Sequence, residues 1–121
     1  MNVKVVENAG VQVALLESDS LLISDIQSAL DLIVNVRYES GCDRIVLAQA
    51  AISPDFFKLR TGLAGEVLQK FSNYQAKLAI VGDFSQYQSK PLQDFMRESN
   101  AGRDVFFVTS EDEAVARLAK A

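Results

Sequence analysis

The fold is decided by two short apolar runs, Arg44–Ala48 (RIVLA) and Lys77–Val81 (KLAIV). Neither run alternates between apolar and polar residues, which is typical of a strand that is covered on both faces of a sheet. Asp104–Val108 (DVFFV) predicts a third strand of the same kind. Segments with helical spacing lie between these runs, so we expect parallel strands joined by right-handed crossovers.

A β-hairpin is predicted before the first of these strands. Val3–Glu7 and Val11–Leu16 have strand character, and Asn8 and Gly10 between them suit a tight turn. The predicted order is therefore β-β-α-β-α-β-α-β-α. This is one α/β domain spanning residues 1–121, with a mostly parallel sheet and an N-terminal antiparallel hairpin.

Four helices are predicted from the spacing of apolar residues and from end signals. The first has the stripe Ile23, Ile26, Leu30, Ile33 and Val34, with Val36 off the stripe. Ser24 and Gln27 would form its capping box, and the alternative is that the helix begins earlier, near Ser20. Gly41 is expected to end it.

The second helix has the apolar stripe Leu63, Val67, Leu68, Phe71 and Tyr74. The third opens at Ser89-Lys90-Pro91 and ends near Gly102, and the fourth opens at the capping box Ser110 and Glu113.

Composition excludes several classes of function. The net charge is −4, and the 12 Lys and Arg residues are scattered, so we expect no binding to nucleic acid. The chain has no histidine, which removes the commonest general base and metal ligand. Cys42 is the only cysteine, so an internal disulfide is excluded. We see no signal peptide and no apolar run long enough for a bilayer, and we expect a cytoplasmic protein without a membrane partner.

Ligands of open α/β sheets bind beyond the carboxyl ends of the strands. Three predicted loops meet there: Gln49–Gly62, Gly82–Ser89 and Thr109–Glu111. The sharpest local feature in them is the helix entry Thr61–Gly65 (TGLAG).

Thr61 is the predicted N-cap of the second helix. Gly62 and Gly65 would let an anion approach free N–H groups at the positive end of the helix dipole, and Lys58 and Arg60 lie beside them. In the alternative interpretation, Thr61 only caps the helix and the glycines pack against a strand. The spacing fits neither a Walker loop nor the dinucleotide fingerprint.

Two acidic residues are candidates for a pocket, Asp55 and Asp83. Asp83 follows a buried strand, a position where acids hold metal in several α/β folds, and Asp55 is the second acid. The alternative is that Asp83 is a turn residue. We predict that Cys42 is an inert, partly buried thiol and that Phe56-Phe57 and Phe106-Phe107 belong to the core. No cofactor or metal is predicted.

The order of elements and the Thr-Gly loop resemble the STAS domains, the fold of bacterial anti-sigma-factor antagonists. The similarity is carried by Asp55–Gly65 (DFFKLRTGLAG) and Val105–Ala114 (VFFVTSEDEA). In those antagonists a partner kinase phosphorylates the hydroxyl residue before the glycine, so the resemblance implies this role for Thr61. The chain departs from the family at Leu59-Arg60, where the antagonists have an acidic residue and a hydroxyl residue.

The whole sequence is also similar to a small bacterial family known as domain of unknown function 4180. Three stretches carry this similarity: Leu22–Leu32, Tyr38–Arg44 and Leu78–Ser85. The family name implies no activity.

Three functions follow as hypotheses. The first is a non-catalytic regulatory or interaction module whose partner, another protein, contacts the surface around Lys58–Glu66. The second is a binder of a small anionic metabolite at the start of the second helix. The third and least favoured is an enzyme that uses Asp55 and Asp83, with or without a divalent metal. The chain is expected to be a monomer, or a homodimer that pairs through the hairpin or Val105–Val108.

Overall fold

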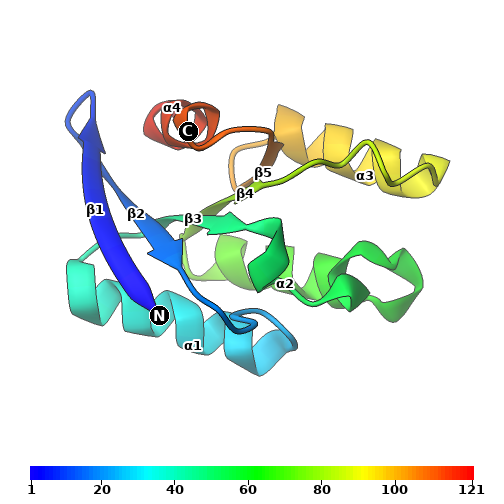
Figure 1. Ribbon diagram of the computed structural model, residues 1–121, viewed down its shortest axis with the longest axis horizontal. Coiled ribbons are helices and arrows are strands. Elements are labelled where there is room, and N and C mark those ends of the chain that lie inside the picture. Colours follow the sequence, from blue (N-terminus) through cyan, green and yellow to red (C-terminus); the bar gives the residue numbers. More distant parts are fainter.

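The computed structural model describes residues 1–121 as one five-stranded sheet flanked by helices (Figure 1). The strands are β1 (Asn2–Asn8), β2 (Val11–Glu17), β3 (Arg44–Ala48), β4 (Lys77–Val81) and β5 (Val105–Val108). They lie in chain order across the sheet; β1 and β2 are antiparallel, and β2 to β5 are parallel. The predicted mixed sheet and its N-terminal hairpin are confirmed.

The helices are α1 (Ile26–Ser40), α2 (Leu63–Asn73), α3 (Lys90–Ala101) and α4 (Glu111–Lys120). Each of the three crossovers moves one strand along the sheet in the same direction. Because crossovers of parallel strands are right-handed, α1, α2 and α3 must lie on the same face. Only α4, which follows the last strand, covers the opposite face (Figure 1).

The sheet therefore separates two apolar cores of unequal size. The larger core joins the sheet to α1, α2 and α3 and includes Phe107, whereas the smaller core lies under α4 and includes Phe106 and Leu118. Adjacent residues of a strand point to opposite faces, which explains why the two phenylalanines belong to different cores. Phe56 and Phe57 are also buried in the larger core, as predicted. Cys42 belongs to the same core and is only 2% exposed, so it is more deeply buried than expected.

The predicted apolar stripe of α1 is right at Ile33, which is buried, and at Ile26, which packs against the core, but it is wrong at Val34 and Ile23. The buried residues of α1 are Ala29, Leu32, Ile33 and Val36. Val34 is 54% exposed, and Ile23 precedes the helix in a bridge with Ile52. The helix begins later than the stripe requires because Asp25, not Ser24, is the N-cap: its carboxylate accepts from the Ser28 N–H at 2.7 Å.

The other helix ends agree more closely with the sequence. Ser110 caps α4 by accepting from the Glu113 N–H at 3.1 Å, and α3 begins at Lys90 after its N-cap Ser89. In α2 the buried face is as predicted except at its end, where Tyr74 is the C-cap residue and is 44% exposed. None of the helices combines the length and the apolar character that a membrane-spanning segment needs.

The two edges of the sheet are β1 and β5, and β5 is protected. The side-chain amide of Asn100 on α3 accepts from the Phe107 N–H at 2.7 Å and donates to the Phe107 carbonyl at 3.2 Å. Asn100 thus takes the place of a neighbouring strand at this point of the edge. An outer strand whose Phe107 N–H and C=O are already bonded is a poorer template for pairing with a second copy.

The hairpin turn contains one strained residue. Asn8 pairs with Val11, so the loop consists of Ala9 and Gly10. Both have positive φ, +53° and +80°, which is the signature of a type I′ turn. This conformation is easy for glycine and tolerated by asparagine, but it is costly for alanine.

Replacing Ala9 with Asn should therefore stabilise the domain by about 0.5–1 kcal/mol, because asparagine visits the left-handed region at lower cost. Urea denaturation of the two proteins measures the difference. Gly10→Ala, in the same turn, should shift the midpoint in the opposite direction. Equal midpoints for all three proteins would contradict the turn type.

Candidate functional site

The candidate site lies at the carboxyl ends of β3 and β4, where the loops 49–62 and 82–89 meet (Figure 1). The first loop is folded into three consecutive 3₁₀ turns, Gln49–Ala51, Pro54–Phe57 and Leu59–Thr61. Ser53 caps the middle turn by accepting from the Asp55 N–H, and Pro54 occupies its first position. The loop is therefore regular backbone with internal hydrogen bonds, and it presents its outer residues in a fixed arrangement.

Thr61 is exposed, but it is not the N-cap of α2 as predicted. It ends the third 3₁₀ turn, and its hydroxyl lies 2.8 Å from the carbonyl oxygens of both Asp55 and Lys58. The same hydroxyl accepts from the Leu63 N–H at 3.2 Å. Thr61 therefore connects the loop to the first turn of α2, while Gly62 takes the cap position itself.

Gly62 and Gly65, at the start of α2, have different environments from those expected. Gly62 has a φ of +77°, a conformation that favours glycine. A Cβ added at Gly62 or Gly65 would meet no atom within 4 Å, so the interpretation that they pack closely against a strand is wrong. Lys58 lies 3.5 Å from the Asp55 carboxylate, whereas exposed Arg60 makes no ion pair.

The two candidate acids have separate local partners. The Asp83 carboxylate accepts from the backbone N–H of Ser85 at 3.0 Å and from its hydroxyl at 2.6 Å. These bonds, the hydroxyl first, lower the pKa of Asp83 from the usual 3.8, because they stabilise the charged form. Asp83 therefore acts as a turn residue, which was the alternative interpretation of this position. Asp55 instead pairs with Lys58. The structure contains no group of three or more His, Cys, Asp or Glu side chains able to hold a metal ion.

Gln49, Gly82 and Tyr87 form a contact between the two loops that the sequence did not indicate. The Gln49 side-chain amide donates to the Tyr87 hydroxyl at 2.6 Å. The amide lies directly over Gly82, where an added Cβ would be 2.3 Å from Gln49 Oε1 and 2.8 Å from Gln49 Cβ. Only glycine leaves room for this arrangement. The only sequence signal was the position of Gly82 after a buried strand.

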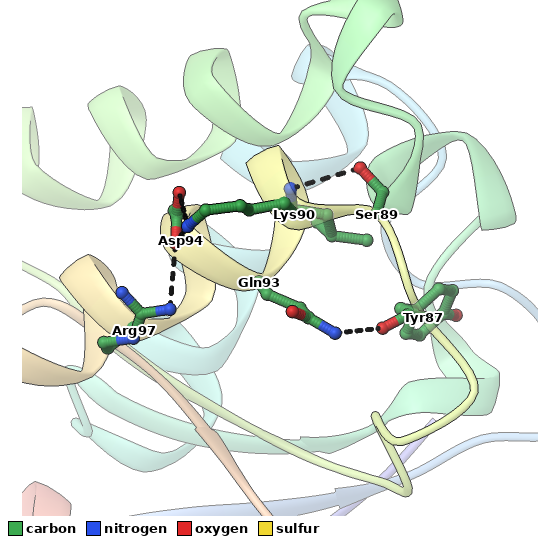
Figure 2. A network of polar contacts seen from close by, with 7 residues as sticks. Tyr87, Ser89, Lys90, Gln93, Asp94 and Arg97 are labelled. Atoms are coloured by element: carbon green, nitrogen blue, oxygen red, sulfur yellow. Dashed lines mark hydrogen bonds and ion pairs between the residues drawn. The ribbon is translucent and has the colours of Figure 1, made fainter.

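Tyr87 is held at three further points. Its ring is stacked on Phe57, with 4.9 Å between centroids and 11° between planes. Its N–H donates to the Phe84 carbonyl at 3.1 Å, and its own carbonyl accepts from the Gln93 amide at 3.1 Å. Figure 2 shows Gln93 reaching from α3 to Tyr87. The aromatic ring is therefore fixed before any ligand or partner binds.

The start of α3 carries a small ion-pair network beside this contact (Figure 2). Asp94 lies between Lys90 and Arg97, with nitrogen–oxygen distances of 3.1 and 2.8 Å. The hydrogen bond from Lys90 is the main reason why the pKa of Asp94 is lowered. Exposed pairs of this kind add little stability, so the network chiefly orients the surface of the helix.

The two loops and the segment after β2 enclose a shallow cavity of about 380 Å³, here called the uncharged hollow. It is lined by Leu21, Gln49, Ala50, Ile52, Pro54, Phe57 and Tyr87, none of which is charged. The lining is mostly apolar, and the bonded pair Gln49 and Tyr87 supplies its polar atoms. A cavity of this size and composition suits an apolar side chain or a small molecule.

Replacing Gly82 with Ala should destabilise the domain by about 1–3 kcal/mol, the usual cost of inserting a methyl group into a packed contact. Part of the cost comes from displacing Gln49 from Tyr87. Urea denaturation gives the stability, and NMR spectra of the Tyr87 ring report its surroundings. Gly65→Ala is the matched control, because its added methyl group enters open space inside a helix and should be neutral or stabilising. Equal behaviour of the two variants would contradict the contact.

A family model described as Domain of unknown function (DUF4180) matches residues 8–118. No curated protein and no solved structure matches the chain. The matched span runs from the end of β1 to the last turn of α4, so it covers nearly the whole domain. It includes the loops of the candidate site, and it confirms the similarity seen in the sequence. The chain therefore belongs to the DUF4180 family.

Proposed function

We propose that this chain is a non-catalytic interaction module with a STAS-like fold, and that its partner is another protein. The partner docks on the loop 49–62 and on the first turn of α2, as far as Glu66. The observation that carries the proposal is the uncharged hollow, which adjoins this loop and opens between preformed turns. We also propose a cytoplasmic location, where the lone thiol of Cys42 stays reduced.

The hollow has the properties of an anchor pocket in a protein interface. Such interfaces are dominated by a few apolar or aromatic groups buried in preformed pockets and surrounded by a polar rim. Leu21, at the edge of the hollow, is 49% exposed, and Pro54 is also exposed. Arg60, Thr61 and Glu66 supply exposed polar groups nearby in the chain. An apolar partner side chain in the hollow would gain affinity without a cost of ordering the loop.

Thr61 is the proposed point of control, by phosphorylation as in the domains that this chain resembles. A phosphate would remove the hydroxyl proton that bonds to the carbonyls of Asp55 and Lys58. It would also add negative charge before α2, where the helix dipole and the unpaired Arg60 favour it. Phosphorylation would thus loosen the third 3₁₀ turn and change the surface that the partner contacts.

A capture experiment from the native cytosol tests the proposal. The tagged wild-type chain should retain a defined protein, and Thr61→Glu should change the amount retained at least tenfold. Leu21→Glu should abolish capture, because it puts a charge at the edge of the uncharged hollow. Thr109→Glu is the matched control, since Thr109 is also an exposed threonine and lies between β5 and α4, outside the loop 49–62. No captured protein, or equal effects of both threonine variants, would refute the proposal.

A thermal-shift screen with phosphorylated metabolites separates this function from anion binding. A ligand at the start of α2 should stabilise the fold by about 3 kcal/mol at a hundredfold excess over its dissociation constant. The Leu63 N–H that such an anion would use is already bonded to Thr61. We therefore expect no stabilisation, and a strong hit that Arg60→Gln removes would favour the anion binder instead.

A further inference from the structure

The face of the sheet under α4 is only partly covered. α4 has 10 residues and is the only helix on this face, whereas three helices cover the other. The part left open is a cavity of about 390 Å³ at the carboxyl ends of β2, β3 and β4, here called the charged-rim hollow. It is lined by Asn2, Lys4, Leu15, Leu16, Glu17, Ser18, Asp19, Val46, Ala48, Ala50, Ala51, Val81 and Glu111.

The floor of the charged-rim hollow is apolar. Leu15, Val46 and Val81 come from three neighbouring strands and pack against the core under α4. Leu15 and Val81 remain partly exposed, and Ala48, at the end of β3, is exposed. The rest of the chain covers Leu15 and Val81 only in part, and both lie at the end of the sheet where ligands of α/β folds bind. The floor would accept a short hydrocarbon chain.

The rim is charged, and its charges are unpaired within the protein. Glu17, Asp19 and Glu111 contribute three negative charges and Lys4 one positive charge, which leaves two negative charges. None of these four residues takes part in any of the five ion pairs of the structure. Lys4 lies opposite Leu15 in the register of β1 and β2, and Asn2 lies opposite Glu17. An occupant that carries positive charge would therefore be attracted, and an anionic one repelled.

We propose that the charged-rim hollow binds a small organic cation, an amine on a short aliphatic chain. The hydrocarbon part lies over Leu15, Val46 and Val81, and the ammonium group lies among the rim carboxylates. Lys4 competes with the ligand for these carboxylates. This site does not include Thr61 or the start of α2, and it shares only Ala50 with the lining of the uncharged hollow. Its occupation therefore does not require the interaction proposed above.

The probe for this site is n-hexylamine, with n-hexanol and hexanoate as matched neutral and anionic probes. Two-dimensional NMR of the ¹⁵N-labelled chain at low salt should show shifts of the amides in 15–19 and 48–51. A ligand of this size should bind with a dissociation constant of about 1 mM. Hexanol should bind at least tenfold more weakly, and hexanoate should not bind. Raising the salt concentration should weaken the binding of the amine, since exposed charges are screened.

Substitutions of acidic and basic residues in the rim should change the affinity for hexylamine in opposite directions. Glu17→Gln and Glu111→Gln should each weaken binding of hexylamine about threefold to tenfold, and Lys4→Gln should strengthen it. Ala48→Phe fills the hollow from an exposed position and should abolish binding. Glu98→Gln is the control, because it removes an exposed acid on α3, across the sheet. Circular dichroism and the melting temperature verify that each variant is folded.

Three results would overturn the proposal. The first is an absence of shifts in 15–19 and 48–51 on adding hexylamine. The second is equal binding of hexanol, which would show that charge plays no part. The third is weaker binding by Lys4→Gln, which would show that the lysine, and not the carboxylates, holds the ligand. Capture of a partner through the Thr61 surface is unaffected by each of these results, so the two proposals fail independently.

Discussion

Replacing Phe107 with Ala should lower the free energy of unfolding by about 3–5 kcal/mol, the usual cost of truncating a buried phenylalanine. Phe107 lies at the centre of the aromatic cluster, within 6.4 Å, centroid to centroid, of Phe56, Phe57, Phe84 and Phe95. The deletion leaves a cavity under the loops 49–62 and 82–89. A domain of this size is stabilised by about 5–15 kcal/mol in total, so this single substitution should remove a large share of the stability.

Urea denaturation measures this effect, and Phe106→Ala is its matched control. Phe106 is equally buried but faces α4, where the Arg117 guanidinium lies 4.6 Å from its ring centroid. Both variants should lose stability to a similar degree, but only Phe107→Ala should shift the NMR signals of Phe84 and Tyr87. A loss below about 1 kcal/mol for Phe107→Ala would show that the aromatic cluster is not packed as described.

Asn100→Leu should cost about 2–4 kcal/mol and should promote association between copies. The substitution removes both partners of the Phe107 backbone, and each buried group left without a partner costs about 1–3 kcal/mol. It also exposes the outer side of β5, which then offers free N–H and C=O groups to another strand. Denaturation measures the first effect, and sedimentation velocity over a range of concentrations measures the second.

The same substitution at Asn35 is the control. Asn35 is exposed on α1 and its side chain makes no hydrogen bond, so Asn35→Leu should change stability by less than about 0.5 kcal/mol. If Asn100→Leu stays monomeric at all concentrations, the amide of Asn100 does not protect the edge. A homodimer of the wild-type chain would then have to be sought at β1, the other edge of the sheet.

The order of helices and strands was predictable because it depends on short-range patterns of apolar residues and turn residues. Continuous apolar runs such as Arg44–Ala48 and Lys77–Val81 have few alternatives to a covered strand. The hairpin turn was predictable from Asn8 and Gly10, although Asn8 pairs with Val11 and the positive φ angles fall on Ala9 and Gly10. Capping by Ser89 and Ser110 is likewise local, because the bonded groups lie only three residues apart.

The buried face of α1 was not predictable from the same patterns. Val34 is as apolar as Val36, and the choice between them depends on where the helix begins and on what it packs against. Ile23 fitted the stripe but is used in the bridge to Ile52, a contact between segments far apart in the chain. Tertiary contacts of this kind leave no periodic signal in one sequence.

The candidate site was predicted in position but not in detail. The loops after β3 and β4 do meet, as expected for parallel strands, yet Thr61 bonds to carbonyls instead of capping α2 directly. The contact among Gln49, Gly82 and Tyr87 joins two loops more than 30 residues apart, Gln49 and Tyr87 being separated by 38 positions. Such a contact depends on the packing of both loops, and residue types alone do not reveal it.

The agreement between chain order and sheet order makes this domain a short linear array. Each strand pairs only with the strands next to it in the chain, as the units of a solenoid protein contact only their neighbours. Such an array has no internal reason to stop at five strands, because another strand and helix could extend it beyond β5. Asn100 ends the array, because its side chain bonds to the Phe107 N–H and C=O, to which a further strand would otherwise pair.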